Sequence, residues 1–247
     1  MTGTLFIIVP AYNEEKALTT LLPDLKRTLG EAGFAYHILA VNDGSSDQTS
    51  QLLKSLAAGI RVTELRHEVN QGYGASLKTG FLWVLAHARP GDVAVSLDGD
   101  TTHEPRYIPP MVARLDEGYD IVTASYDMTG GQATGVPFGR RIASRYVNLL
   151  FKLVSPWKGV STYTNGFRAY RLEILQEVHH RYSDHLITDS GFPGGTELFL
   201  KACASGARCA EYPFHLHYEN RCADSKIRIF DTITRYLRLL TQTAKWR

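Results

Sequence analysis

The chain has 247 residues, of which 44% are hydrophobic and 21% are charged, a mixture typical of folded globular proteins. Its formal net charge of +2 is too small for binding driven by nucleic-acid phosphates, so no nucleic-acid partner is expected. No apolar stretch reaches the roughly 18 residues of a membrane-spanning helix, and the first residues lack the pattern of a secretory signal. We therefore expect one large domain that resides in the cytoplasm.

Over the first hundred residues, short β-rich runs alternate with helical patterns. The spacing of leucines predicts a helix over 18–29, which Pro23 should kink or restart. This alternation predicts an α/β fold, a Rossmann-like, mostly parallel central sheet flanked by helices. The predicted strands are Leu5–Val9, Tyr36–Val41, Arg61–Leu65 and Val93–Leu97, and the other helices lie around Leu52–Leu56 and over Ala75–His87.

After Asp100 the pattern is less regular. A Gly-rich stretch, Thr129–Gly139, reads as a mobile loop that could gate a site. The predicted elements are a helix around Pro110–Glu117, a strand at Ile121–Ala124, and helices over Arg140–Val154, Gly195–Ser205 and Arg228–Ala244. The cysteines, Cys203, Cys209 and Cys222, lack zinc or disulfide spacing and should be unpaired thiols.

Polar clusters follow three of the predicted strands: Pro10–Glu14, Asn42–Asp47 and Asp98–Asp100. Because ligands of open α/β sheets lie beyond the carboxyl ends of the strands, these clusters should meet at one site. The first strand is not followed by the G-x-G-x-x-G of a dinucleotide-binding fold, and no P-loop is present.

Each cluster has a structural and a functional interpretation. Asp98 and Asp100, one residue apart at a strand end, suit a divalent cation that also contacts a diphosphate, although acidic turns are common. Asp43 could accept from a nucleobase or ribose, whereas Asp47 or Ser46 better fits a helix cap.

Three further positions stay open between a ligand and the fold. Glu14 could compensate a helix dipole or contact a nucleotide. Tyr12 could flank a nucleobase or simply pack against its neighbours in the fold. The glycines of Asn70–Ala75 could form a turn, bring the backbone to a ligand, or do both.

Taken together, these motifs resemble the inverting GT-A glycosyltransferases, most closely the branch of dolichol-phosphate mannosyltransferases and other polyprenyl-phosphate glycosyltransferases. The resemblance covers nearly the whole chain. Its motifs are Pro10-Ala11-Tyr12-Asn13-Glu14, Asp43-Gly44-Ser45-Ser46-Asp47, Asn70–Ala75, Asp98-Gly99-Asp100, Arg140 with Ser144, Asn165-Gly166-Phe167-Arg168, Glu197, and Arg221 with Ser225-Lys226.

The resemblance implies a role for each motif. The donor nucleoside would be held by Pro10, Tyr12, Glu14 and Asp43. Asp98, Gly99 and Asp100 would meet the donor diphosphate, with Mg²⁺ or Mn²⁺ bound by the two carboxylates, and Arg221 would contact the same diphosphate. Arg140 and Ser144, which share a helical face, would bind the phosphate of a lipid acceptor. Residues 1–225 would form one GT-A catalytic domain, with a nucleotide-binding half at 1–100 and an acceptor half at 101–225.

Four residues depart from the family pattern. Asn42 stands where the first of two aspartates is usual, and Thr102 replaces a glutamine that would complete metal coordination. Tyr126 replaces an acceptor-binding arginine, and Thr162 stands where an aspartate often precedes the Asn-Gly-Phe-Arg segment. The last two changes leave the acceptor open.

The resemblance implies transfer of a sugar, with inversion, from a nucleoside-diphosphate sugar to a polyprenyl-phosphate lipid. A phosphate acceptor needs no protein base, whereas a saccharide or protein hydroxyl, the main alternative, does, and Glu197 is the conditional base. A non-catalytic nucleotide-sugar-binding protein and a nucleotidyltransferase are less favoured.

The last residues, 226–247, are expected to form an amphipathic basic helix. The segment Ser225–Arg247 has six basic residues and one acidic residue, beside Phe230, Tyr236 and Trp246. Such a segment suits peripheral contact with the cytoplasmic membrane face, or it is a packing helix with a charged outer side.

Overall fold

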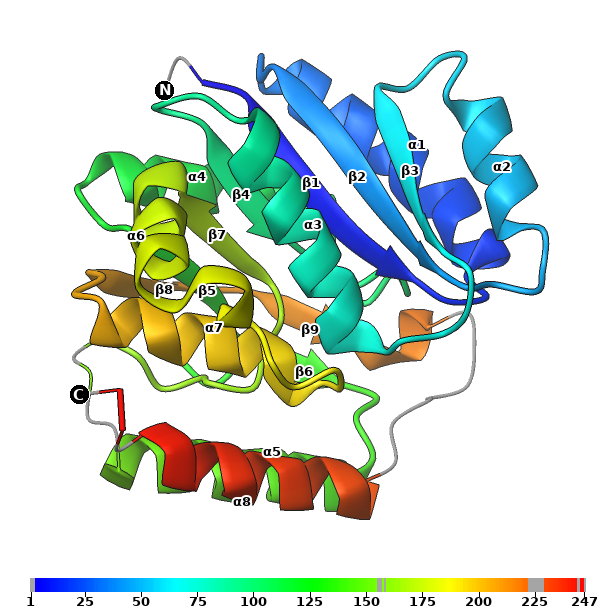
Figure 1. Cartoon of the computed structure of the whole chain (residues 1–247). Helices are drawn as coiled ribbons and strands as arrows, with labels where there is room; N and C mark the ends of the chain where they lie inside the picture. The colour runs from blue at the N-terminus through cyan, green and yellow to red at the C-terminus, as the bar shows by residue number, and fades with distance from the viewer. Residues whose placement is uncertain (1–2, 155–156, 158, 222–228, 244, 247) are drawn as a thin grey trace.

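A seven-stranded sheet runs through the middle of the computed structural model, which describes residues 3–154, 157, 159–221, 229–243 and 245–246. The strand order is β3-β2-β1-β4-β7-β5-β8, and only β7 runs antiparallel to its neighbours. The mostly parallel sheet predicted from the sequence is confirmed (Figure 1). The strands are β1 (Leu5–Ala11), β2 (Tyr36–Asp43), β3 (Val62–His67), β4 (Val93–Ser96), β5 (Ile121–Ser125), β7 (Arg168–Arg171) and β8 (Cys209–Pro213).

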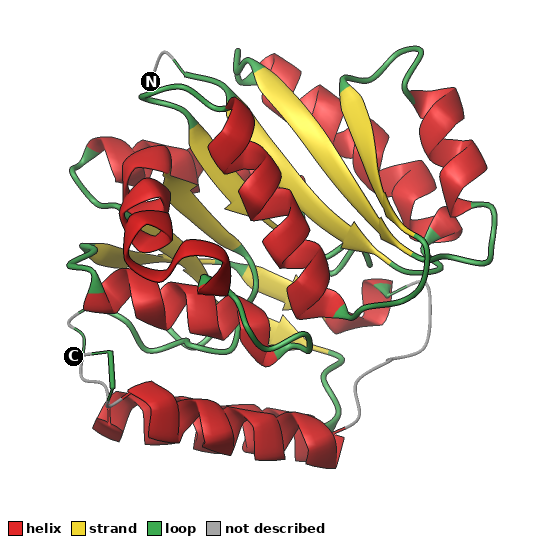
Figure 2. Ribbon diagram, viewed as in Figure 1, coloured by secondary structure: helices red, strands yellow, loops and turns green. Residues whose placement is uncertain are grey.

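Helices cover both faces of this sheet (Figure 2). Alternate residues of β1 point to opposite faces, so Leu5 and Ile7 join one buried cluster while Phe6 and Ile8 join the other. The first cluster is closed by α1 (Glu15–Glu31), α2 (Thr49–Leu56) and α4 (Ile108–Asp116). The second is closed by α3 (Tyr73–His87), α5 (Phe138–Val154), α6 (Leu172–Tyr182), α7 (Pro193–Ala204) and α8 (Ile229–Thr243). Short 3-10 turns lie at Pro105–Tyr107, Ser183–His185 and Tyr218–Asn220.

The helix does not restart at Pro23, because α1 is continuous through it. Pro23 lies on the exposed side of the helix, where the carbonyl left without its helical bond can be hydrated. Leu18, Leu22 and Leu25 are fully buried on the opposite side, and this apolar stripe holds the helix together.

The glycine-rich stretch 129–139 was expected to be a loop, but part of it is a strand. It contains β6 (Gln132–Thr134), which pairs in parallel with β9 (His215–His217) to form a second, two-stranded sheet. A strand of three residues with no alternating apolar pattern leaves no signal in the sequence. Its pairing depends on a partner more than 80 residues away.

The C-terminal helix α8 packs into the same domain. It lies beside α5 and contacts α7 (Figure 1). Tyr236 and Leu239 are buried in the second cluster, so Tyr236 is not available for a membrane. Trp246 is partly buried against that cluster. Phe230, Ser225 and Lys226 were also named above, but the side chain of Phe230 and both other residues lie outside what the structure describes.

Cys203 and Cys209 are free thiols, as expected, with their sulfur atoms 3.4 Å apart. Burial raises the pKa of Cys203 well above its ordinary value. Cys222 lies outside the described residues.

Candidate active site

The end of β4 supplies the acidic wall of a cavity of about 230 Å³. Asp98 and Asp100 both line the cavity, and Gly99 between them lies so close to β1 that a Cβ there would be 2.7 Å from the Pro10 carbonyl oxygen. Only glycine therefore allows this approach. Of the three strand-end clusters expected to share a site, the one at Asp98–Asp100 lines this cavity, whereas Glu14, Asp43 and Asp47 do not.

Each carboxylate has a neighbour that fixes it. The Tyr73 hydroxyl donates to Asp98 Oδ1 over 2.8 Å, and Thr102 donates to Asp100 Oδ1 through its hydroxyl over 2.6 Å. Burial, followed by the charge of Asp98, raises the pKa of Tyr73 well above its usual value. The threonine that replaces the family glutamine thus orients Asp100.

Arg221 faces the same acids. Its Nη2 lies 3.4 Å from Asp100 Oδ2, and both side chains are about nine-tenths buried. Its Nε is buried without a hydrogen-bond partner among the described residues. A buried donor of this kind is costly unless a ligand satisfies it.

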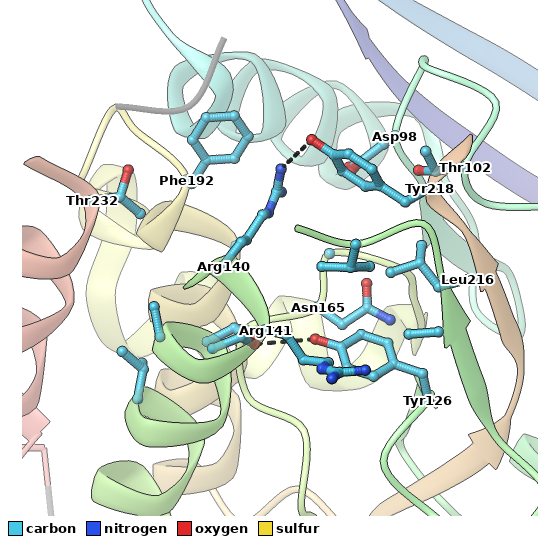
Figure 3. A pocket seen from close by; sticks show the side chains of 18 of the residues that line it. Asp98, Thr102, Tyr126, Arg140, Arg141, Asn165, Phe192, Leu216, Tyr218 and Thr232 are labelled. Atoms are coloured by element: carbon cyan, nitrogen blue, oxygen red, sulfur yellow. Dashed lines mark hydrogen bonds between the residues drawn. The ribbon is translucent and has the colours of Figure 1, made fainter. Parts of the chain in front are cut away.

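The opposite wall of the cavity contains the two predicted acceptor residues, Arg140 and Ser144, both on α5. Arg140 donates to the Tyr218 hydroxyl over 2.8 Å (Figure 3). The hydroxyl of Ser144 lies 3.1 Å from that of Tyr126 and 3.0 Å from that of Thr164. At the position of the family arginine, Tyr126 thus contributes a hydroxyl to a polar chain and no charge.

Tyr218 connects the two walls. Both Arg140 and Arg221 lie over its ring, 5.0 and 5.7 Å from the ring centre, and Arg221 Nη1 is 3.5 Å from its hydroxyl. Arg140, expected to bind the acceptor phosphate, and Arg221, expected to bind the donor diphosphate, therefore share Tyr218 as an aromatic neighbour.

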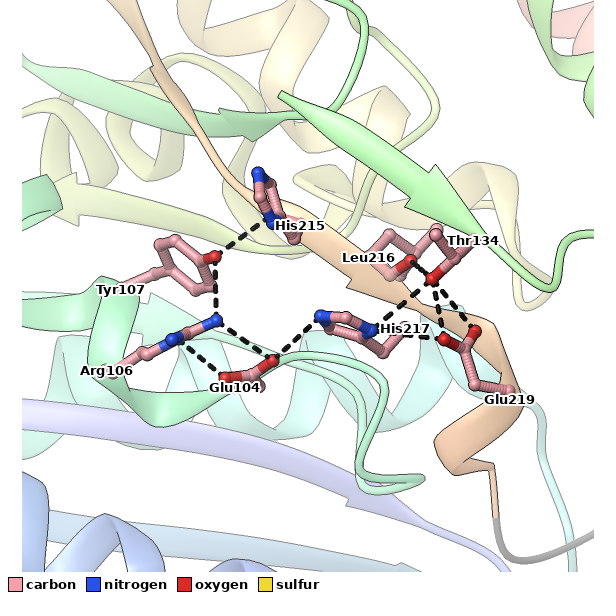
Figure 4. Close-up of polar contacts among 8 residues, drawn as sticks. All are labelled: Glu104, Arg106, Tyr107, Thr134, His215, Leu216, His217 and Glu219. Atoms are coloured by element: carbon pink, nitrogen blue, oxygen red, sulfur yellow. Dashed lines mark hydrogen bonds and ion pairs between the residues drawn. The ribbon is translucent and has the colours of Figure 1, made fainter. Parts of the chain in front are cut away.

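A polar network holds the segment that bears Tyr218 and Arg221 (Figure 4). Thr134 of β6 donates to Glu219 over 2.7 Å, and His217 Nε2 is 3.4 Å from Glu104. The backbone N–H of His215 donates to Tyr107 over 3.1 Å. Hydrogen bonds from its own backbone and from Thr134 lower the pKa of Glu219. The expected gating loop is thereby tied to the cavity wall.

The four residues expected to hold the nucleoside do not line this cavity. Pro10 is buried near the end of β1, all of which is buried. The turn after β1 is linked to the segment after β2, since Asn13 N–H donates to Ser45 over 2.9 Å and Glu14 N–H to Thr49 over 3.2 Å. Tyr12 is half-buried in the same turn and Glu14 is buried.

The carboxylate of Asp43 is engaged in hydrogen bonds within the protein. Its carboxylate accepts the backbone N–H groups of Gln71 and Gly72, each over 2.8 Å, and lies 2.7 Å from His67 Nδ1. The residue after Gly72 is Tyr73, whose hydroxyl donates to Asp98. Asp43 thus fixes the glycine loop that orients the acidic wall. Asp47 lies one residue before Gln48, the N-cap residue of α2, and its Oδ1 accepts the N–H of Thr49, the first helical residue, over 3.0 Å, so it stabilises the start of this helix without being its N-cap.

Glu197 does not fit the base role that was reserved for it. Its carboxylate accepts Thr188 N–H, Thr188 hydroxyl and Asp189 N–H over 2.7–2.9 Å, and it pairs with Lys201 Nζ at 2.5 Å. It is 1% exposed and does not line the cavity, unlike the preceding Thr196. Saturated with donors, it holds the 188–189 turn in place.

Two other departures from the family pattern are structural. Asn42 donates to Glu64 over 2.6 Å and accepts Ser45 N–H over 3.0 Å. Thr162 is buried, with its hydroxyl 2.6 Å from that of Ser125, and does not line the cavity.

The sequence assigned no role to the cavity residues Asp127, Arg141, Arg145 and Tyr218, and it named Tyr73 only as part of the motif Asn70–Ala75. None of these four residues follows a strand predicted in the first hundred residues, whereas Tyr73 comes after the predicted strand Arg61–Leu65. The Asp127 side chain is 22% exposed, and burial raises its pKa although Arg145 lies 4.0 Å away. The signal that could have found it is its position three residues after the end of the predicted strand Ile121–Ala124.

Among protein families, the profile of glycosyl transferase family 2 matches residues 6–179 of the chain. Among curated proteins, the chain is 28% identical over 241 residues to a dolichol-phosphate mannosyltransferase of Pyrococcus furiosus. The match covers 97% of this chain but only 63% of that protein, so the chain spans less than two thirds of its relative.

Solved structures share the fold. A mycobacterial protein superposes with a TM-score of 0.72 at 18% identity, covering 98% of this chain and 75% of the other. Glucosyl-3-phosphoglycerate synthase of Mycobacterium tuberculosis, solved with Mn²⁺, UDP-glucose and phosphoglyceric acid, gives 0.65 at 18% identity, covering 98% and 80%. In the described residues of our chain, no helix is both long enough and apolar enough to span a bilayer.

Proposed function

We propose that this chain, which belongs to glycosyl transferase family 2, is a glycosyltransferase that moves a sugar from a nucleoside-diphosphate sugar, with inversion, to a polyprenyl-phosphate lipid. One observation carries this proposal: a single cavity has the acids Asp98 and Asp100 with Arg221 on one wall and Arg140 with Ser144 on the other. A donor diphosphate and an acceptor phosphate could therefore meet inside this cavity, whose volume is about 230 Å³.

The donor would enter along the carboxyl edge of the sheet. In this proposal Pro10, Tyr12, Glu14 and Asp43 belong to a nucleotide-binding half, residues 1–100, and residues 101–225 form the acceptor half of one catalytic domain. The contact of Gly99 with the Pro10 carbonyl supports continuity between the nucleoside turn and the acidic wall.

A divalent cation fits the acidic wall. Asp98 and Asp100 offer hard oxygen ligands, and the described part of the chain has no group of three His, Cys, Asp or Glu residues that would enclose an ion. Mg²⁺ suits such a site, because it commonly binds one or two carboxylates and takes its other ligands from phosphates and water. When bound, such an ion would neutralise charge on the departing diphosphate.

Residues of the chain itself would bind the donor diphosphate and position the acceptor. Arg221, with its buried Nε, would donate to the diphosphate as the bond from the anomeric carbon to the diphosphate oxygen breaks. Arg140 and Ser144 would hold the acceptor phosphate so that its oxygen forms the new bond from the opposite face. Holding both partners in line accounts for the inversion.

The cationic side chains around the cavity support a phosphate as the acceptor group. Arg140, Arg141 and Arg145 line it, and a phosphate with a second pKa of about 6 is already ionised near neutral pH. Such an acceptor needs no proton removed, which agrees with the absence of Glu197 from the cavity lining. The dolichol-phosphate name of the Pyrococcus relative supports the same acceptor class.

A hydroxyl acceptor, on a saccharide or a protein, is the alternative. Tyr126 in place of the family arginine removes one cation from the acceptor wall, and Asp127 lies on that wall with a raised pKa. Because a hydroxyl must lose its proton, Asp127 would be the base in this case.

The test offers the enzyme radiolabelled UDP-, GDP-, CDP- and dTDP-sugars with a polyprenyl phosphate and Mg²⁺ or Mn²⁺. Label extracted into organic solvent with one donor supports the proposal, and its loss in Arg140→Ala, with donor binding retained, supports the acceptor wall. Label that stays in water on an added saccharide, and that Asp127→Asn abolishes, favours the alternative. No transfer from any donor would contradict both.

A further inference from the structure

One hydroxyl group, that of Tyr218, is shared by two arginines from opposite walls of the cavity. Arg140 donates to it over 2.8 Å, and Arg221 Nη1 lies 3.5 Å from it. A phenol oxygen has two lone pairs, so it can accept from both guanidinium groups. At 3.5 Å the contact with Arg221 is at the limit of a hydrogen bond, so the hydroxyl is committed mainly to Arg140.

The ring of Tyr218 allows two like charges to share one neighbourhood. The guanidinium carbons of Arg140 and Arg221 lie 5.0 and 5.7 Å from the ring centre. An aromatic face attracts a cation, and the attraction grows where water is excluded. Asp100, 3.4 Å away, offsets the charge of Arg221. Without the ring, the two guanidinium groups would repel each other and, on their long flexible side chains, move apart.

The turn that carries this tyrosine, Tyr218–Asn220, is attached to the acidic wall. The Thr101 hydroxyl donates to the Asn220 carbonyl oxygen over 2.8 Å, and Thr101 directly follows Asp100. Thr101 has a φ of +67°, a left-handed conformation that is rare for a β-branched residue and that its surroundings must hold. The network in Figure 4 holds the same turn through Glu219. Tyr218 is therefore fixed relative to Asp100 before any ligand binds.

We propose that Tyr218 is a positioning residue whose hydroxyl orients Arg140 for the acceptor phosphate and whose ring holds Arg140 and Arg221 where the two phosphate sites meet. Figure 3 shows the Arg140 side chain reaching from α5 to this hydroxyl. An arginine that is oriented beforehand loses less side-chain freedom when it binds an anion, which strengthens binding without a new contact. The inference deepens the proposed function and rests on it for the identity of both ligands.

Two substitutions separate the hydroxyl from the ring. Tyr218→Phe keeps the ring and removes the hydroxyl, so it should act mainly through Arg140. We expect the acceptor KM to rise about tenfold, while kcat stays within about threefold and the affinity for a nucleoside diphosphate within about twofold of the wild type. Tyr218→Leu also removes the ring, and it should in addition weaken nucleoside diphosphate binding at least about fivefold, because Arg221 loses its aromatic neighbour.

A double-mutant cycle with Arg140→Ala shows whether Tyr218 acts through this arginine. If it does, adding Tyr218→Phe to Arg140→Ala should raise the acceptor KM less than about twofold further, because the side chain to be oriented is gone. A structural role alone would give the same ratio in both backgrounds. The matched control is Tyr119→Phe, which should leave the acceptor KM within about twofold of the wild type. Tyr119 also has two arginines near its ring, Arg114 at 5.2 Å and Arg208 at 5.7 Å, but does not line the cavity.

The measurements are steady-state transfer by the full chain to a short-chain polyprenyl phosphate in solution and calorimetric titration with the nucleoside diphosphate of the active donor. Thermal unfolding checks that each variant folds. An unchanged acceptor KM in Tyr218→Phe would overturn the inference, as would an equal effect of this substitution in the wild type and in Arg140→Ala. Either result leaves the proposed function standing, because the wild type still transfers sugar. No transfer by the wild type to the polyprenyl phosphate would instead contradict the proposed function, and the inference would fall with it.

Discussion

The guanidinium of Arg221 lies 3.4 Å from the carboxylate of Asp100, although the two residues are 121 positions apart in the sequence. Asp100 is held from its other oxygen by Thr102, while Arg221 keeps a buried Nε without a partner among the described residues. The pair therefore offers an anion a donor group that is already oriented.

Replacement of Arg221 by Ala should lower kcat about 100-fold, because one preoriented donor to the leaving diphosphate is lost. Arg221→Lys should recover only part of this loss, since an ammonium lacks the planar fork of the guanidinium. Steady-state kinetics with saturating donor and acceptor measure both. A kcat within twofold of wild type in Arg221→Ala would remove this residue from the mechanism.

Asp100→Asn should abolish metal-dependent nucleotide binding. In the wild type, a nucleoside diphosphate with Mn²⁺ at 100 times its dissociation constant adds about 2.7 kcal/mol and should raise Tm by several degrees. The variant should show no added effect of Mn²⁺. Asp184→Asn, an exposed acid far from the acidic wall in sequence, serves as the control and should respond like the wild type. A full metal response in Asp100→Asn would mean that the ion binds elsewhere.

Lys201→Met should destabilise the fold by about 3 kcal/mol, because it leaves the buried carboxylate of Glu197 without its cation. Burial also lowers the pKa of Lys201, in opposition to Glu197, so the lysine depends on this pair to stay charged. Urea unfolding measures the change against Lys26→Met, an exposed lysine on α1. A stability equal to wild type would show that the pair contributes nothing net.

Stability should fall as the pH rises above 10. Burial raises the pKa of Tyr170 in the folded state to about 12, from an ordinary value of 10. Below pH 10 the phenol is protonated in both states, and its contribution is complete. Between pH 10 and 12 only the unfolded chain loses the proton, so about 1.4 kcal/mol is lost per pH unit for this group.

The variant Tyr170→Phe should make the alkaline fall in the free energy of unfolding shallower by that amount. Tyr146→Phe removes a phenol that is 60% exposed and should leave the slope unchanged. Urea titrations at several pH values between 9 and 11 provide the measurement. Identical slopes in the wild type and Tyr170→Phe would contradict the prediction.

The sequence by itself predicted the α/β sheet and the strand-end acids, because both depend on local patterns. Apolar runs such as Leu5–Val9, rich in β-branched residues, are typical of buried strands, and the carboxyl ends of parallel strands meet at one edge. Asp98, Asp100, Arg140, Ser144 and Arg221 were named from the sequence, and they line one cavity.

Only the tertiary structure decided which side chains are already used by the fold. Asp43 is occupied by backbone donors 28 and 29 residues away, and Glu197 by Lys201 and the 188–189 turn. Tyr218 acquires its place between Arg140 and Arg221 through a contact across 78 residues. Such contacts follow from how distant segments pack, and no local periodicity records them.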